Sequence, residues 1–299
     1  MNSPTQSEPQ PQADLRTWKI TLAYDGTDYS GWQVQPGQRT IQGELQAALG
    51  RVTGEAPLPQ GSGRTDAGVH ALAQVASFGL RAAIPADNLR RALNRTLPAA
   101  IRAVEAKIVA NDFHARHSTV AKTYEYRVFL ERPRHGGEVP GSDALCPPFL
   151  ARYVYAYPWP MEFETLHEAA RAFVGTHDFL SFAATDPDLK TRMGEEDEDS
   201  DPVSDDGRPV AAPTAIRTIF ASAWEQRQIE EGTLLVYRVR GSGFLHHMVR
   251  NLVGTMLDVG RGYRSADEIP AMIAARARAA AGPTAPARGL FLHSVEYGD

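Results

Sequence analysis

At positions 61–71 the chain reads Gly61-Ser62-Gly63-Arg64-Thr65-Asp66-Ala67-Gly68-Val69-His70-Ala71, a glycine-rich run with one carboxylate. Its glycines allow positive φ angles or a close approach of the backbone to a partner. Nothing in the run supports a helix or a strand, so it predicts a loop, and loops held by a rigid scaffold often carry binding and chemistry. The alternative is a tight surface turn in which Asp66 accepts backbone hydrogen bonds. Composition alone favours that alternative.

The residues on either side of this loop predict alternating strands and helices. Apolar and polar residues alternate over 18–24, which is typical of a half-buried strand. Ile41 and Leu45 follow helical spacing behind Thr40, a candidate N-cap, and this helix is expected to end near Gly50. The first half therefore reads β-α-β-α-β, with a strand at 18–24, a helix at 40–50, a strand at 74–78, a helix at 87–95 and a strand at 102–109.

The second half repeats this mixture of elements. Thr165 and Glu168 form a capping-box pattern at the start of a helix, and Glu230-Glu231-Gly232 indicates a hairpin. The other expected elements are strands at 124–130, 216–228, 234–240 and 290–297, a long helix from 245 to 260 and an alanine-rich helix at 271–281. Residues 140–160, rich in proline, are expected to be extended.

The fold class that these patterns favour is α/β (α+β), in two similar halves. Each half is expected to be a mainly antiparallel sheet with helices packed on one face. The predicted domains are a disordered tail over 1–16, an N-terminal domain over 17–117, and a C-terminal domain over 118–299 with a mobile acidic insert at about 186–212.

Composition limits the classes of protein. The chain has 299 residues, of which 42% are apolar and 22% charged, as in a soluble protein of two domains. No apolar run approaches the ~20 residues that cross a membrane, and the polar N-terminus is not expected to be a signal peptide. Cys146 is the only cysteine, so no intrachain disulfide is possible, and a reducing cytoplasm is expected.

The net charge of −5 is unevenly distributed. Residues 186–206 hold ten acidic and two basic side chains, a net −8, so that the remaining residues carry +3. This mild basic excess suffices for a nucleic-acid partner only if it is focused in one cleft.

Several common motifs are excluded at the glycine-rich loop. No Gly-Lys-Ser/Thr follows as in a P-loop, and Asp66 replaces the third glycine of a dinucleotide fingerprint. Asp66 and His70 alone do not make a metal site.

The loop resembles the signature of the bacterial tRNA pseudouridine synthase A family, and it does so through Gly63–His70. Other parts of the chain resemble the same family in the same order, over about Trp18 to Tyr297. These are Tyr24-Asp25-Gly26-Thr27, Gly31-Trp32-Gln33, Thr40-Ile41-Gln42-Gly43, Asp112-Phe113-His114-Ala115-Arg116, Lys122-Thr123-Tyr124-Glu125-Tyr126, Phe244-Leu245-His246-His247-Met248-Val249-Arg250-Asn251 and Gly289-Leu290-Phe291-Leu292.

The resemblance implies an enzyme that isomerises uridine to pseudouridine at positions 38–40 of the tRNA anticodon stem-loop. It implies an active-site cleft between the two halves, a homodimer that binds tRNA across both subunits, and no cofactor or metal. The target base must leave its stack to reach a buried carboxylate. The order in which bonds are made around Asp66 stays open.

The candidate catalytic residues are Asp66, Tyr124 and Arg64. The resemblance makes Asp66 the nucleophile, and Arg64 could keep it ionised or contact a phosphate. Tyr124 is expected to pack against the target base and to take a proton; the alternative is a core residue of a strand. The candidate substrate-binding residues are Tyr124, Leu290, Gly289, His246 and Arg250. From its pattern Leu290 is a core residue of a strand; the resemblance places it against the uracil, with Gly289 permitting the approach.

His246 and Arg250 are four residues apart at the start of the long helix, where a phosphate could bind. The alternative, about equally favoured by the sequence, is that His246 and Arg250 are ordinary polar residues on the surface of the helix. Two other functions stay open: a non-catalytic RNA-binding module on the same scaffold, and an acid–base hydrolase using Asp66 and His70. An intact Asp66 and Tyr124 argue against the first, and the second lacks a partner carboxylate.

Overall fold

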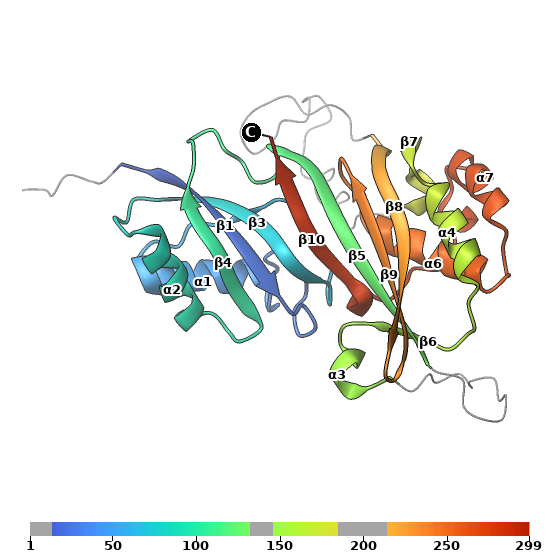
Figure 1. The fold of residues 1–299 in the computed structure, drawn as a ribbon. Helices are drawn as coiled ribbons and strands as arrows, with labels where there is room; N and C mark the ends of the chain where they lie inside the picture. The colour runs from blue at the N-terminus through green and yellow to red at the C-terminus, as the bar shows by residue number, and fades with distance from the viewer. Residues whose placement is uncertain (1–13, 132–145, 185–213, 299) are drawn as a thin grey trace, which may run out of the picture. The chain divides into compact units, whose positions relative to one another are not determined.

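The computed structural model describes residues 14–131, 146–184 and 214–298. The chain divides into two compact units: unit 1 comprises residues 1–67 and 71–119, and unit 2 comprises residues 68–70 and 120–299. Both mix mainly antiparallel strands with helices, which confirms the predicted class (Figure 1). Most of the predicted tail, the acidic insert at 186–212 and the first part of the proline-rich stretch lie outside the described residues.

Unit 1 is built on an antiparallel sheet in the order β4–β1–β3, to which the short β2 adds beside β3. Alternate residues of β1, among them Trp18, Ile20 and Leu22, are fully buried, as the sequence pattern predicts. Helices α1 and α2 pack on each other, and α2 packs on β4 (Figure 1). The elements are β1 (Arg16–Tyr24), α1 (Ile41–Thr53), β2 (Gln60–Gly61), β3 (His70–Leu80), α2 (Ala86–Thr96) and β4 (Ile101–Ile108).

Helix α1 begins as predicted but ends later. The Thr40 side chain accepts a hydrogen bond from the backbone N–H of Gly43, so Thr40 is the N-cap. The helix passes through Gly50 and stops at Gly54, whose φ of 77° is the left-handed conformation that closes many helices. Gly50 is a helical residue because the next glycine, not this one, adopts positive φ.

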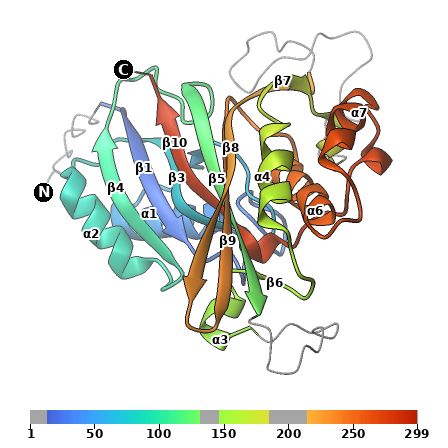
Figure 2. The ribbon, with the colours of Figure 1, turned by 45° about the vertical axis from the view of Figure 1, so that its right-hand side comes forward.

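The strands of unit 2 follow the order β10–β5–β9–β8–β7, with the short β6 parallel to β5. The predicted hairpin is confirmed as β8 and β9. Helix α4 packs against β8 and α6 (Figure 2). The main elements are β5 (Thr119–Glu131), α3 (Pro148–Ala151), β6 (Tyr155–Tyr157), α4 (Phe163–Arg171), β7 (Gly175–Asp178), β8 (Ile216–Ile229), β9 (Gly232–Gly241), α6 (Met248–Gly260), α7 (Ile269–Ala274) and β10 (Leu290–Tyr297). Four short 3-10 turns complete the described part: η1 (Leu180–Phe182), η2 (Ala266–Glu268), η3 (Arg278–Ala280) and η4 (Ala287–Gly289).

The predicted capping box at α4 is wrong. Helix α4 starts at Phe163 with Glu162 as N-cap, and Thr165 lies within the first turn. Its hydroxyl donates to the Glu162 carbonyl at 2.8 Å, the local back-bonding that threonine often makes inside a helix. A capping box does occur at Ser265 and Glu268.

Two predicted helices are shorter than expected, and positive φ explains both. Helix α6 begins at Met248, not at 245, because His247 adopts φ 57° just before it. The alanine-rich segment is helical only over α7, after which Arg276 adopts φ 49° and the separate turn η3 follows. Among the described residues, no helix is long and apolar enough to cross a membrane.

Candidate active site

The glycine-rich loop connects β2 to β3 and is irregular, as predicted. Within it, Thr65 is buried, whereas Arg64 before it is exposed and Asp66 after it is half-buried. The side chain between the two charged residues therefore faces the interior of unit 1. The loop is therefore anchored at Thr65, and the Arg64 side chain is exposed.

Thr65 is fixed by two partners that are distant in sequence. Its carbonyl accepts a hydrogen bond from the backbone N–H of Trp32 at 3.0 Å. Its hydroxyl and that of Tyr24 lie 2.8 Å apart in a buried hydrogen bond. Burial raises the pKa of Tyr24 well above its ordinary value, despite that hydrogen bond, so the phenol stays neutral. Both backbone and side chain of the residue before Asp66 are thus anchored.

Two glycines allow the loop to lie this close to its support. A Cβ on Gly31, whose φ is 86°, would lie 2.5 Å from the Thr65 carbonyl oxygen and 3.0 Å from the Asp66 carbonyl carbon. A Cβ on Gly61 would lie 2.6 Å from the Trp32 ring. The loop therefore packs directly against Gly31 and Trp32.

In unit 2, Tyr124 lies on β5, and its side chain is largely buried. The Phe244 ring meets it edge-on, with the centroids 5.0 Å apart. Tyr126, two residues further on, donates its hydroxyl to the Pro286 carbonyl at 2.7 Å. Burial also raises the pKa of Tyr126. The Tyr126 hydroxyl therefore has a structural role, because it fixes the segment that leads into β10.

Leu290 is the first residue of β10 and is buried, and Gly289 is the last residue of η4. A Cβ on Gly289 would lie 2.8 Å from both the Tyr126 ring and the Arg127 carbonyl oxygen. The protein's own packing therefore requires glycine there, a reason that the sequence pattern did not provide.

The predicted helix face shared by His246 and Arg250 is wrong, because His246 precedes α6 and only Arg250 lies in it. The His246 and His247 rings stack with centroids 4.0 Å apart. Arg250 donates from Nε to the Ala285 carbonyl at 2.7 Å, and the backbone N–H of Ala285 donates back to the Arg250 carbonyl. Part of the Arg250 guanidinium therefore holds the chain before η4.

His70 is buried, and its Nε2 lies 3.1 Å from the carbonyl oxygens of both Arg152 and Arg288. Two acceptors at that nitrogen require it to carry the proton. Its ring also stacks on Phe291, at 4.7 Å between centroids. In this arrangement Nε2 is a donor to the backbone, which disfavours a hydrolase that would use this nitrogen as its base.

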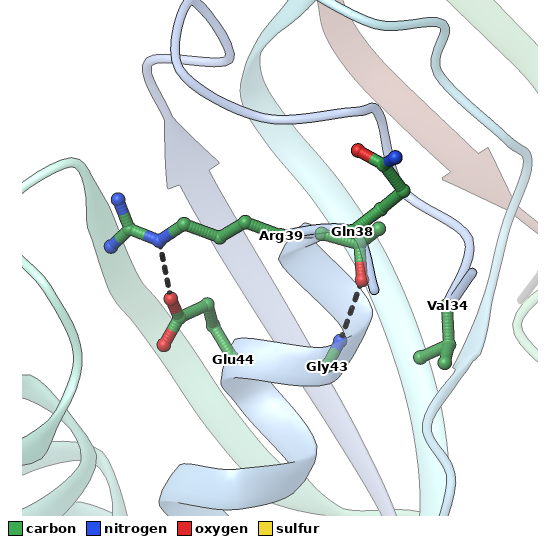
Figure 3. Close-up of a pocket in the computed structure, with 6 residues that line it drawn as sticks. Val34, Gln38, Arg39, Gly43 and Glu44 are labelled. Carbon is green, nitrogen blue, oxygen red and sulfur yellow. Dashed lines mark hydrogen bonds and ion pairs between the residues drawn. The ribbon is translucent and has the colours of Figure 1, made fainter. Parts of the chain in front are cut away.

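Arg64 and Asp66 thus belong to unit 1, and Tyr124, Leu290, Gly289, His246 and Arg250 to unit 2. A shallow pocket in unit 1 contains none of them (Figure 3). It lies at the start of α1, where Arg39 pairs with Glu44 at 2.7 Å and Thr40 caps the helix. Its lining comprises Val34, Gln38, Arg39, Thr40, Gly43 and Glu44.

The model of a family described as tRNA pseudouridine synthase matches residues 20–118 and 193–298. The chain belongs to this family. Relatives named tRNA pseudouridine synthase A include one from Solibacter usitatus, 46% identical over 95% of this chain and 100% of the relative. Another, from Moorella thermoacetica, is 43% identical over 93% of this chain and 98% of the relative.

Membership of the tRNA pseudouridine synthase family confirms the resemblance drawn from the motifs. Enzymes of this family are isomerases that act on uridine in tRNA. Sequence reasoning placed Tyr24 and Trp32 in motifs of the family but missed that they support the loop. The signal that could have found Tyr24 is a phenol at a buried strand position, which needs a polar partner.

Proposed function

We propose that the chain isomerises uridine to pseudouridine at positions 38–40 of the tRNA anticodon stem-loop, with Asp66 as the nucleophile. Family membership supports the reaction. The observation that carries the role of Asp66 is the anchoring of Thr65, which fixes the backbone immediately before the carboxylate and leaves Asp66 only half-buried. A nucleophile held on a fixed backbone is already oriented when the substrate binds.

The reaction exchanges the N–C glycosidic bond of one uracil for a C–C bond at the same ribose. No net oxidation or hydrolysis occurs, so the chemistry requires only a carboxylate and groups that move a proton. Attack of Asp66 at the ribose, its attack at the uracil ring, and elimination to a glycal all use the same residues. We assign Tyr124 to the target base and to proton transfer.

The other candidates are assigned to binding. The exposed Arg64 guanidinium suits a phosphate, because its planar fork matches phosphate oxygens. Leu290, with Gly289 before it, is assigned to the uracil. His246 and Arg250 are assigned to the RNA backbone. We further propose a cytoplasmic homodimer that binds one tRNA across both subunits.

The test is incubation of the purified protein with tRNA carrying tritium at uracil C5. Isomerisation places a carbon bond at C5 and releases the tritium, whereas an RNA-binding module or a hydrolase leaves it in place. Transcripts with uridine at only one of positions 38, 39 and 40 should each release label. Release from transcripts that carry uridine only outside these positions would contradict the assigned site.

A further inference from the structure

Gln74 is a buried amide on β3 that faces the glycine-rich loop. It is fully buried and lies opposite Leu22 of β1. Between this pair and the next one, Tyr24 with Ala71, β3 carries one residue more than β1. Such a bulge turns the side chains beside it away from the regular pattern of the strand.

The carboxamide of Gln74 uses both of its ends on the loop. Its Oε1 accepts from the Ser62 hydroxyl at 2.7 Å and from the backbone N–H of Val75 at 3.2 Å. Its Nε2 donates to the Gly63 carbonyl at 2.9 Å. The Tyr24 hydroxyl, which holds Thr65, also hydrogen-bonds Gln74. One side chain therefore links the anchors on both sides of Arg64.

We propose that Gln74 is a positioning residue for catalysis, which fixes the backbone of residues 62–65 and so the place of the Asp66 carboxylate. The inference rests on the proposed role of Asp66. An amide suits this task because it accepts from one loop residue and donates to the next, which neither a carboxylate nor an apolar side chain can do. Its burial prevents water from replacing either bond.

Gln42 provides a matched control in the same unit. It is also a buried amide, and it too makes two bonds to backbone: its Oε1 accepts from Val34 and its Nε2 donates to the Pro59 carbonyl, both at 2.8 Å. Neither partner belongs to residues 62–66. Gln74→Leu and Gln42→Leu should therefore cost similar stability, while only the first should disturb the loop.

The test measures turnover on C5-tritiated tRNA, tRNA affinity and amide hydrogen exchange for both variants. Gln74→Leu should lower kcat about a hundredfold more than Gln42→Leu, the scale of a 1 Å misplacement. Its tRNA affinity should match that of Gln42→Leu. Exchange at residues 62–66 should accelerate only in Gln74→Leu. Equal kcat losses, or equal exchange, would reduce Gln74 to a structural role.

Gln74→Glu adds a readout that packing alone would not give. A carboxylate can still accept from Ser62, but its second oxygen would face the Gly63 carbonyl, and protonation would restore a donor there. Its kcat relative to wild type should therefore rise as the pH falls. A ratio of the Gln74→Glu kcat to the wild-type kcat that does not change with pH would contradict the inference. This test applies even if Gln74→Leu does not fold.

Wild type and Asp66→Asn are measured alongside. If wild type releases no tritium, or Asp66→Asn matches it, the proposed function fails. The exchange comparison still decides whether Gln74 fixes the loop.

Discussion

Tyr124 on β5 has two interpretations, a core residue of the strand and a group that contacts the target base. Its near-complete burial and its edge contact with Phe244 fit a core residue. The neighbouring Tyr126 already fills a structural role through its bond to Pro286.

Substitutions at Tyr124 separate its hydroxyl from its ring. Tyr124→Phe should lower kcat by about 10²–10⁴, the range for a lost proton-transfer group, and leave tRNA affinity nearly unchanged. Tyr124→Ala should weaken binding as well, because the stacking surface is lost. Single-turnover rates and tRNA titrations of both variants give the answer. If Tyr124→Phe turns over at the wild-type rate, the residue only packs.

Single residues were predictable from sequence where the chemistry is local. The glycine-rich setting of Asp66 could be recognised without a structure. The roles of Tyr24, Trp32 and Gln74 could not, because each depends on a partner more than ten residues away. The packing role of Gly289 could not be predicted either, because the Tyr126 ring that occupies the space beside it lies far away in the sequence.

At the scale of elements, the loop depends on the close contact between the segment at Gly31 and the Thr65–Asp66 backbone. Gly31→Ala should lower the stability for two reasons: the position has a positive φ, and the added Cβ would clash with the Thr65 carbonyl. Gly37 is the control, because its φ is also positive, at 69°, but its Cβ would meet nothing within 4 Å.

Gly37→Ala should therefore cost only the backbone term, about 1–2 kcal/mol, and leave turnover unchanged. Gly31→Ala should cost more in urea unfolding and should also reduce kcat. Equal effects of the two substitutions on stability and turnover would show that the contact with the loop is unimportant.

A second element-scale prediction concerns Glu125, which joins β5 to β9. Its carboxylate accepts from Arg127 at 2.7 Å and from Arg238 at 2.9 Å. Burial alone would raise the pKa of Glu125, but the two guanidinium groups outweigh it and hold the pKa below its ordinary value of 4.5. These ion pairs therefore stabilise the fold fully above about pH 4.5, and the contribution is lost as the pH falls through the lowered pKa.

Glu125→Gln should cost about 2 kcal/mol at pH 7, the scale of hydrogen bonds to a charged group. The difference from wild type should shrink below pH 4.5, as urea unfolding at several pH values would show. Glu225→Gln is the matched control, because Glu225 also pairs with Arg238 but is exposed, and its effect should be smaller. A constant difference across pH would contradict the assigned charge state.

The order and type of the elements followed from sequence better than their ends did. Strands β1 and β10 and the β8–β9 hairpin matched their periodicity. The ends of α1, α6 and α7 did not, because they are set by the positive φ of Gly54, His247 and Arg276. Two of these residues are not glycine, so no local propensity indicates the break.

At the scale of the whole molecule, charge is the property that most affects RNA binding. Residues 187–206 carry a net −7, nine acidic against two basic side chains, so their deletion would change the net charge from −5 to +2. We expect the deletion to raise tRNA affinity modestly at low salt and less at high salt, because salt screens exposed charges beyond ~10 Å at 0.1 M.

The measurement is a tRNA titration at two ionic strengths. A variant of the same length with Asn or Gln in place of seven of the nine acids also carries +2, so it separates charge from length and should match the deletion. Loss of binding or of soluble protein in the deletion variant would show that the segment is structural.

The central claim is that the Asp66 carboxylate performs the isomerisation, and Asp66→Asn tests it most directly. The amide keeps the shape but removes the nucleophile. With C5-tritiated tRNA in single turnover, this variant should bind tRNA as wild type does and release tritium at least about a thousandfold more slowly. Asp87→Asn, at an exposed position of α2, should behave as wild type. Release by Asp66→Asn at the wild-type rate would contradict the account.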